Sequence, residues 1–335
     1  MKRRDMLKLT GLAIGGLALP AISSPLVLAA EQKKLVMVVK IIGIPWYNLV
    51  EQGLKKAGKE FDFDVSMVGP SNIDPAQQVR LVEDLIARQA DYIGLVPLDE
   101  KVMAPVLARA QDAGIKVITE EGPNQAGRDW DVALVDNKQF GEATMKSLAE
   151  GMGGKGEYVV YVGTLTTPLH NQWADAAIAY QKANYPEMKL ATERFPGADE
   201  IDTAQRNTLD VLKAHPNLRG IVAYGSNGAI GAGNAIRQQR RQDQVTLVGT
   251  SVPSQAAAMI KDGTIRETFL WNPFDTGYAL VAVAKLMRDG ATFEDGMTVP
   301  GLGEARVDVA NKRIAINKIM VVNKDTIDEL LAMGI

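Results

Sequence analysis

Residues 38–48, "VVKIIGIPWYN", carry the chain from a buried strand into a helix. The run 35–39 is continuously apolar, which is typical of a strand covered on both faces. Lys40 ends this run, and Trp46 and Tyr47 follow a turn that contains Gly43 and Pro45. Only 6% of the chain is aromatic, so two rings beside a cation at a strand end favour a ligand site. The alternatives are a core ring under the helix and a lysine that extends into solvent.

The same strand-then-helix order recurs along the whole chain. Such alternation predicts parallel sheets with helices on both faces. Helical patterns cover residues 74–89, 203–214 and 275–288, and a last strand over 316–322 precedes a closing helix, "KDTIDELLAM". The other expected strands form two series: 35–40, 64–68, 92–96, 115–119 and 131–135, then 158–162, 190–195, 220–223, 245–249 and 267–270.

Residues 1–30 have the layout of a cleaved export signal. A basic start with Arg3 and Arg4 precedes a mostly apolar stretch, and small residues follow, with cleavage expected after Ala29 or Ala30. The paired arginines indicate the twin-arginine (Tat) type of address. The apolar stretch is too short and glycine-rich for a membrane anchor. We therefore expect a protein of the periplasm.

About 305 residues remain, which exceeds the size of one hydrophobic core, so two domains are expected. The expected N-terminal α/β domain comprises residues 31–136 plus 273–300. The expected C-terminal α/β domain comprises residues 137–272 plus 301–335. In open parallel sheets ligands bind outside the carboxyl ends of the strands, so two facing domains would form a cleft lined by strand ends.

Composition excludes several kinds of site. Removing residues 1–30 takes away four basic side chains against one acidic side chain, so the net charge moves from −3 to −6, and nucleic acid is disfavoured as a partner. The chain has no cysteine, which excludes disulfides, thiolate metal sites and a thiol nucleophile. His170 and His215 are the two histidines and lack clustered partners, so we expect no metal. No cofactor is expected, and the glycines of 151–156 lack the residues of a phosphate loop.

Polar and aromatic side chains gather where the expected strands end. A sugar suits this mixture, because its hydroxyl groups donate and accept hydrogen bonds while its C–H faces pack on rings. Glu120 and Glu121 point to opposite sides if their strand continues, so at most one of them is expected to face the cleft and the other is expected to be solvated. The candidate ligand-binding residues are Lys40, Trp46, Tyr47, Glu121, His170, Asn171, Tyr224, Ser226, Asn227, Ser251, Trp271 and Asn272.

The chain from about residue 34 to 322 resembles the type I periplasmic sugar-binding proteins of bacterial ABC importers. The matching pieces are "VVKIIGIPWYN", "GPSNIDPAQQVRLVEDLIARQADYIGLVP", "HNQW" and "LWNPFDTGYA", and the rhamnose-binding and autoinducer-2-binding subgroup is the most similar. The resemblance implies two doubly wound α/β domains joined by three crossovers. It also implies a monomer that closes on a ligand and delivers it to an ABC permease of the inner membrane. It places around the ligand Lys40, Trp46, Tyr47, Glu121, Asn171, Tyr224, Ser226 and Trp271 or Asn272.

The chain departs from the autoinducer-2 relatives at Glu120-Glu121-Gly122, at Leu169-His170 and at Tyr224-Gly225-Ser226. These departures argue against autoinducer-2 as the ligand. A chemoreceptor role is compatible with the sequence, and a DNA-binding repressor is not, because an export signal stands at the N-terminus. The enzymatic alternative is a periplasmic sugar-processing enzyme that uses two carboxylates. Adjacent strand residues such as Glu120 and Glu121 cannot flank one bond from opposite sides, so we expect a binding protein without catalysis.

Overall fold

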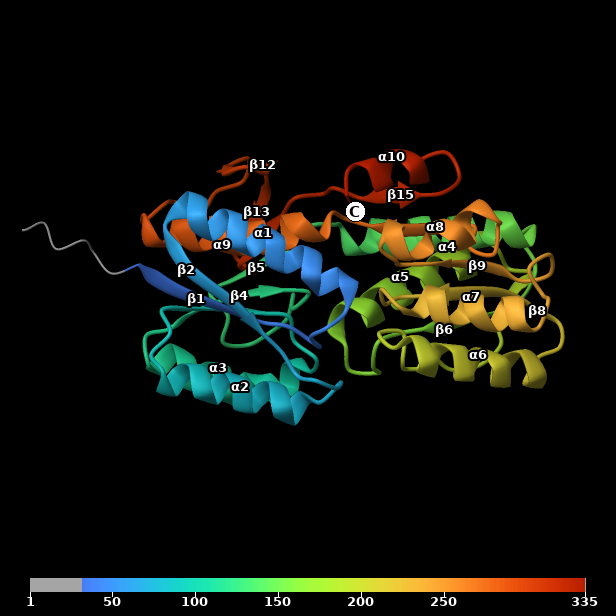
Figure 1. The fold of residues 1–335 in the computed structure, drawn as a ribbon, viewed down its shortest axis with the longest axis horizontal. Coiled ribbons are helices and arrows are strands. Elements are labelled where there is room, and N and C mark those ends of the chain that lie inside the picture. The colour runs from blue at the N-terminus through green and yellow to red at the C-terminus, as the bar shows by residue number, and fades with distance from the viewer. Residues whose placement is uncertain (1–31, 335) are drawn as a thin grey trace, which may run out of the picture. The chain divides into compact units, whose positions relative to one another are not determined.

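The computed structural model describes residues 32–334, so the predicted export signal lies outside the described residues. Two mainly parallel sheets organise the chain, each with helices packed against it (Figure 1). This arrangement confirms the predicted fold class. No helix within residues 32–334 has both the length and the apolar character needed to cross a bilayer.

The first sheet has the strand order β13-β14-β5-β4-β3-β1-β2. Helices α1 and α9 pack together on one face, and α2 and α3 pack together on the other (Figure 1). The helices are α1 (Pro45–Phe61), α2 (Pro75–Ala87), α3 (Glu100–Asp112) and α9 (Pro273–Arg288). The strands are β1 (Lys33–Val38), β2 (Phe63–Val68), β3 (Tyr92–Leu95), β4 (Lys116–Glu120), β5 (Trp130–Ala133), β13 (Arg306–Asp308) and β14 (Arg313–Ala315).

The second sheet has the order β15-β10-β9-β8-β6-β7, and its parallel strands repeat the order of the first. Its helices pack in the pairs α4 with α5 and α6 with α7. The strands are β6 (Gly156–Tyr161), β7 (Met188–Leu190), β8 (Leu218–Ala223), β9 (Thr246–Gly249), β10 (Glu267–Leu270) and β15 (Met320–Val322). The helices are α4 (Asn137–Met152), α5 (Pro168–Asn184), α6 (Ile201–Ala214), α7 (Gly228–Gln238), α8 (Pro253–Lys261) and α10 (Ile327–Ala332).

The chain passes between the two sheets three times, after β5, after β10 and after β14. The third passage corrects the expected domain boundary. Strands β13 and β14 lie within the segment 301–335 assigned to the C-terminal domain, yet β14 pairs parallel with β5 of the first sheet. An unpaired β5 would expose a row of backbone hydrogen-bonding groups, and β14 covers that edge. The passage therefore lies between β14 and β15, and a separate hairpin of β11 (Thr298–Val299) and β12 (Gly303–Glu304) precedes it.

Two expected strands are shorter than their sequence patterns. The strand expected over 190–195 shares only Leu190 with β7, which begins earlier at Met188, and the only bridge beyond β7 in this expected range joins Phe195 to Tyr161. The strand expected over 316–322 begins at Met320 and pairs antiparallel with β10.

Candidate ligand-binding site

Both sheets have a topological switch point, between β1 and β3 in the first and between β6 and β8 in the second. A crevice forms outside the carboxyl ends of strands at such a point. Lys40 follows β1, and residues 163–170 follow β6. Gln78 fixes the first of these ends, because its buried amide donates to Val39 O and Val96 O at 3.1 and 2.8 Å and accepts from Leu98 N–H at 3.0 Å. The backbone before Lys40 is thereby held in place.

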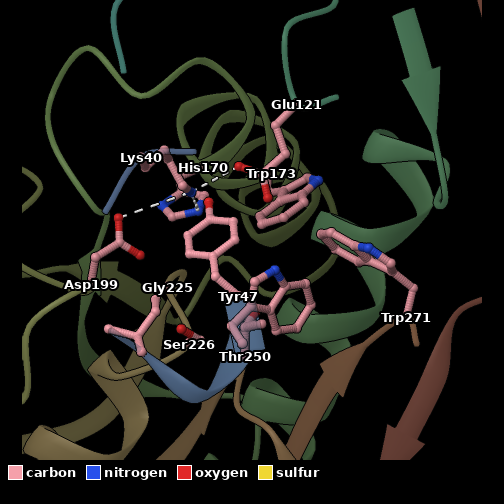
Figure 2. Close-up of a pocket in the computed structure, with 12 residues that line it drawn as sticks. Lys40, Tyr47, Glu121, His170, Trp173, Asp199, Gly225, Ser226, Thr250 and Trp271 are labelled. Atoms are coloured by element: carbon pink, nitrogen blue, oxygen red, sulfur yellow. Dashed lines mark hydrogen bonds and ion pairs between the residues drawn. The ribbon is translucent and has the colours of Figure 1, made fainter. Parts of the chain in front are cut away.

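A small cavity of about 20 Å³ lies where residues from both domains meet (Figure 2). This volume holds about one water molecule, so a larger ligand enters only if the surrounding parts move. Apolar rings and polar groups share the wall. The lining residues are Lys40, Ile44, Trp46, Tyr47, Glu121, His170, Trp173, Asp199, Gly225, Ser226, Thr250 and Trp271.

Lys40 is the electrostatic centre of this cavity. Its Nζ lies 2.8 Å from Glu121 Oε2, 3.1 Å from His170 Nε2 and 4.0 Å from Asp199 Oδ2 (Figure 2). Burial alone would lower the pKa of Lys40, but the charges of Asp199 and Glu121 outweigh it and raise that pKa above its usual value. Lys40 therefore remains a buried ammonium that contacts both domains.

A tight turn after β4 aims Glu121 at Lys40. Glu121 has a φ of 59°, a left-handed conformation that is uncommon for residues other than glycine. Asp131 holds this turn, since its Oδ1 accepts from Thr119 Oγ1 at 2.8 Å and from Gly122 N–H at 3.2 Å. The expectation that one of the two glutamates is solvated is wrong, because Glu120 is 3% exposed and Glu121 is 6% exposed. The turn buries Glu120 beside a neighbouring cavity of about 10 Å³ that Asp131 and Arg313 also line.

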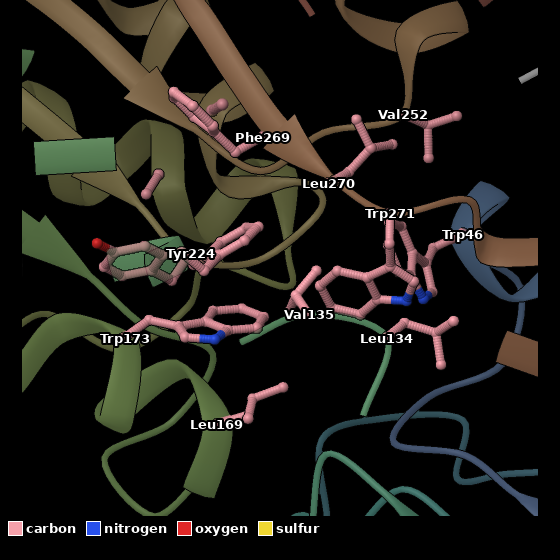
Figure 3. Close-up of a cluster of buried hydrophobic side chains, with 14 of the residues drawn as sticks. Trp46, Leu134, Val135, Leu169, Trp173, Tyr224, Val252, Phe269, Leu270 and Trp271 are labelled. Atoms are coloured by element: carbon pink, nitrogen blue, oxygen red, sulfur yellow. The ribbon is translucent and has the colours of Figure 1, made fainter. Parts of the chain in front are cut away.

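Aromatic rings form the other part of the wall. Trp46 and Trp271 meet edge to face, and Trp173 lies near them (Figure 3). Trp173 contacts Trp271 edge to face and stacks on His170. Hydrogen bonds fix two of the indoles, from Trp271 Nε1 to Thr276 Oγ1 at 2.7 Å and from Trp173 Nε1 to Asn137 Oδ1 at 3.3 Å. Trp46 and Trp271 are therefore core residues that also line the cavity, and ligand binding by Trp46 stays a prediction.

The structure brings seven of the twelve predicted site residues to this cavity. They are Lys40, Trp46, Tyr47, Glu121, His170, Ser226 and Trp271.

The other five predicted residues lie outside its wall, and in three of them local partners hold the polar groups. Asn171 Nδ2 donates to two carbonyls at the start of α5, and its Oδ1 accepts from Arg194. The Tyr224 hydroxyl lies 2.6 Å from Thr144 Oγ1 in the core. Asn272 caps α9 by accepting from Phe274 N–H at 3.0 Å.

The remaining two of these five lie behind the wall. Asn227 Nδ2 donates to the carbonyl of Asp199 at 2.9 Å, so Asn227 positions a lining residue. Ser251 is fully buried next to the lining residue Thr250.

Asp199 is the main functional candidate that the sequence analysis missed. It lies in the loop after β7, and Ala198 N–H donates to Val162 O at 3.0 Å, which brings that loop to the end of β6. Asp199 follows the strand expected over 190–195 by four residues, so its position after a strand end is the signal that could have identified it. Trp173 is also absent from the predicted site residues. It follows His170 by three residues on α5 and therefore lies on a similar face of that helix.

Two parallel-sheet domains that share a mixed apolar and charged cavity at their strand ends define a cleft-type ligand-binding protein. The sequence matches the family model described as a periplasmic binding protein domain over residues 35–292, so the chain belongs to that family. The predicted family is confirmed, and its members are binding proteins.

Known relatives agree with this assignment. The D-ribose/D-allose-binding protein of Pseudomonas aeruginosa is 26% identical over 271 residues, which cover 76% of this chain and 84% of that protein. A solute-binding protein from Clostridium phytofermentas with bound L-rhamnose has a TM-score of 0.83 at 22% identity, covering 90% of this chain and 99% of that one. LsrB from Clostridium saccharobutylicum in complex with AI-2 has a TM-score of 0.81 at 18% identity, covering 88% and 99%. At these identities the two structures establish the fold.

Proposed function

We propose that this protein binds one small sugar or polyol in the periplasm and delivers it to the permease of an ABC importer. The observation that carries the proposal is the cavity wall, in which tryptophan and tyrosine rings face a buried cluster of Lys40, Glu121 and Asp199. Ring faces suit the C–H surface of a sugar, and the charged groups suit its hydroxyls. The names of relatives that bind ribose, allose and xylitol support this class of ligand.

Binding would couple to closure of the two domains. Lys40 lies in the first domain, whereas His170 and Asp199 lie in the second, so a ligand at Lys40 contacts both. A ligand shifts a conformational equilibrium only by binding one state more tightly. The cavity of about 20 Å³ is smaller than a monosaccharide, so entry requires an open state and retention requires a closed one.

A thermal-shift screen tests the proposed function. The panel contains D-ribose, D-allose, L-rhamnose, D-fucose, D-arabinose and xylitol. A ligand at 100 times its Kd stabilises the folded state by about 2.7 kcal/mol. Titration calorimetry then measures the Kd of each hit, and failure of the whole panel to shift the unfolding temperature would contradict the proposal.

We also propose that the protein acts as a monomer and leaves the ligand chemically unchanged. Residues 32–334 contain no group of three or more potential metal-ligating side chains. Glu121 is paired with Lys40, and the adjacent Glu120 lies outside the main cavity wall. An enzyme that uses two carboxylates needs both of them at the substrate, so this arrangement does not favour the enzymatic alternative. Recovery of the sugar after long incubation, analysed by NMR, tests this point, and a chemically altered sugar would contradict it.

Export through the twin-arginine signal completes the proposal. We expect the mature chain to begin at Ala30 or Glu31. Mass spectrometry of a periplasmic extract measures the mature N-terminus, and replacing Arg3 and Arg4 by lysine should keep the precursor in the cytoplasm. A mature pool that retains Met1 would contradict this expectation.

A further inference from the structure

The imidazole of His170 lies between two groups that can only donate hydrogen bonds. Gly163 N–H donates to Nδ1 at 3.0 Å, and Lys40 Nζ lies 3.1 Å from Nε2. A neutral imidazole has one donor nitrogen and one acceptor nitrogen. Whichever tautomer His170 adopts, one of these two donors therefore faces another N–H.

The backbone determines which contact is mismatched. Gly163 and His170 belong to the same domain, and Gly163 N–H donates to Nδ1, so we assign the lone pair to Nδ1 and the proton to Nε2. Burial, with the charge of Lys40 added, lowers the pKa of His170 well below its usual value, so the ring is neutral. The Nε2–H group and the Lys40 ammonium thus both direct hydrogens into the space between them.

Asp199 provides the complementary group. Only 4% of Asp199 is exposed, and among residues 32–334 its Oδ2 has no hydrogen-bond partner. The distance of 4.0 Å to Lys40 Nζ is too long for a hydrogen bond. One buried acceptor therefore lies beside two buried donors, at the wall of one cavity (Figure 2).

We propose that Lys40, His170 and Asp199 form a subsite for one ligand hydroxyl, and that this subsite selects uncharged polyols over their acids. The hydroxyl oxygen accepts from Lys40 Nζ and from His170 Nε2–H, while its hydrogen is donated to Asp199 Oδ2. A hydroxyl offers two lone pairs and one donor, which matches all three groups. This inference rests on the proposed function and specifies its ligand class.

The surrounding charge disfavours a carboxylate or phosphate in the same place. Such a group could accept from Lys40 and His170 but has no hydrogen for Asp199. It would also lie close to Glu121, whose charge Lys40 already neutralises. An open groove that shares Ile44 and Asp199 with the cavity is lined by Glu200 and Asp202 as well as Arg206. An anion would therefore meet a net acidic approach.

Nitrogen NMR of the histidine rings tests the geometry without any ligand. The protein has two histidines, so a His215→Gln variant assigns both sets of signals. At pH 8 we expect His170 to be protonated on Nε2 and unprotonated on Nδ1. The opposite tautomer would give Lys40 an acceptor and would overturn the proposed subsite.

Titration calorimetry on the full mature protein tests the selectivity. The probes are D-ribose with D-ribose 5-phosphate, D-galactose with D-galacturonate, and the neutral panel above. For the neutral probe that binds most tightly, Asp199→Asn should weaken binding about ten-fold or more, because one acceptor of a charged hydrogen bond becomes a donor. Where the neutral sugar of a pair binds, we expect its charged partner to bind about a hundred-fold more weakly than that neutral sugar. Asp210→Asn, an exposed change on α6, is the matched control.

His170→Phe supplies a second variant, because it keeps a ring against Trp173 and removes the Nε2–H donor. It should weaken binding of the same neutral probe, whereas His215→Gln should not. Acids that bind as tightly as their neutral partners, or an Asp199→Asn variant with unchanged affinity, would overturn the subsite and leave the proposed function standing. Absence of binding by every neutral and acidic probe would overturn the proposed function, and the subsite with it.

Discussion

Trp46 and Trp271 meet edge to face with their ring centroids 5.1 Å apart and their planes at 83°. Trp46 is the second residue of α1, and Trp271 lies in the passage between β10 and α9. Helices α1 and α9 pack against each other, so this contact joins the start of the first domain to a connection between the domains. Each ring also lines the cavity.

Trp46→Ala should therefore lower both stability and affinity. We expect the free energy of unfolding to fall by about 3–5 kcal/mol, as for other buried aromatic residues. Sugar binding should weaken because one ring of the wall is lost. Denaturant unfolding and calorimetric titration measure the two effects on the same variant. Trp46→Phe should restore part of each.

Trp130→Ala is the matched control for this variant. Trp130 stacks on Phe293 with centroids 4.3 Å apart, and it does not line the cavity. It should lower stability and leave affinity unchanged. Equal losses of affinity for Trp46→Ala and Trp130→Ala would contradict a specific role of Trp46 in the wall.

Lys40→Met should destabilise the protein strongly. Lys40 and Glu121 are both about 5% exposed at their side chains and lie 2.8 Å apart. Removing one member of a buried ion pair leaves an uncompensated charge, at a cost of about 3–5 kcal/mol. The double variant Lys40→Met/Glu121→Gln should lose less than the sum of the single losses. Additive losses in the double-mutant cycle would show that the pair is not coupled.

Glu120→Gln should change how stability depends on pH. Burial, with the nearby charge of Glu121, raises the pKa of Glu120 well above its ordinary value of 4.5. A carboxyl whose pKa is raised by folding stabilises the folded state below 4.5 and loses that contribution as the pH rises through its folded-state pKa. The wild type should therefore lose stability relative to Glu120→Gln as the pH increases from about 5.

Urea unfolding of both proteins between about pH 4 and 8 measures this difference. Other titrating groups, such as His170, contribute to both proteins and largely cancel in the comparison. Parallel stability curves over the whole range would mean that Glu120 titrates normally.

Asn272→Ala should affect stability without affecting binding directly. Asn272 caps α9 through its bond to Phe274 N–H, and loss of such a cap costs about 1 kcal/mol. We expect the Kd of the bound sugar to stay within about two-fold, since Asn272 lies outside the cavity wall and effects at separate sites are largely independent. A large increase in Kd at normal stability would instead make Asn272 a ligand-binding residue.

The strand-end rule explains how much of the site was predictable. Parallel strands place all their carboxyl ends at one edge, so residues that follow successive strands converge whatever lies between them. Lys40, Trp46, Glu121, His170 and Trp271 were found in this way, although they are far apart in the chain. The alternation of strand and helix patterns likewise predicted both sheets, because hydrophobic periodicity is a local property.

Competition for hydrogen bonds explains why some predicted residues that follow strands do not line the cavity. Asn171, Tyr224 and Asn272 also follow strands, but a helix start, a core hydroxyl and a helix cap use their polar groups. A side chain that satisfies nearby backbone is not free to meet a ligand. Sequence alone does not show which partner is nearer.

The sequence by itself thus determined two α/β domains and a cluster of polar and aromatic residues at their strand ends, since both follow from local periodicity and chain order. Only the tertiary structure decided that β13 and β14 complete the first sheet, because the free edge of β5 selects its partner across a large sequence separation. It also decided that Asp199 reaches Lys40, through a loop whose course depends on the bond from Ala198 N–H to Val162 O. The orientation of Glu121 depends likewise on a turn held by Asp131 from the neighbouring strand.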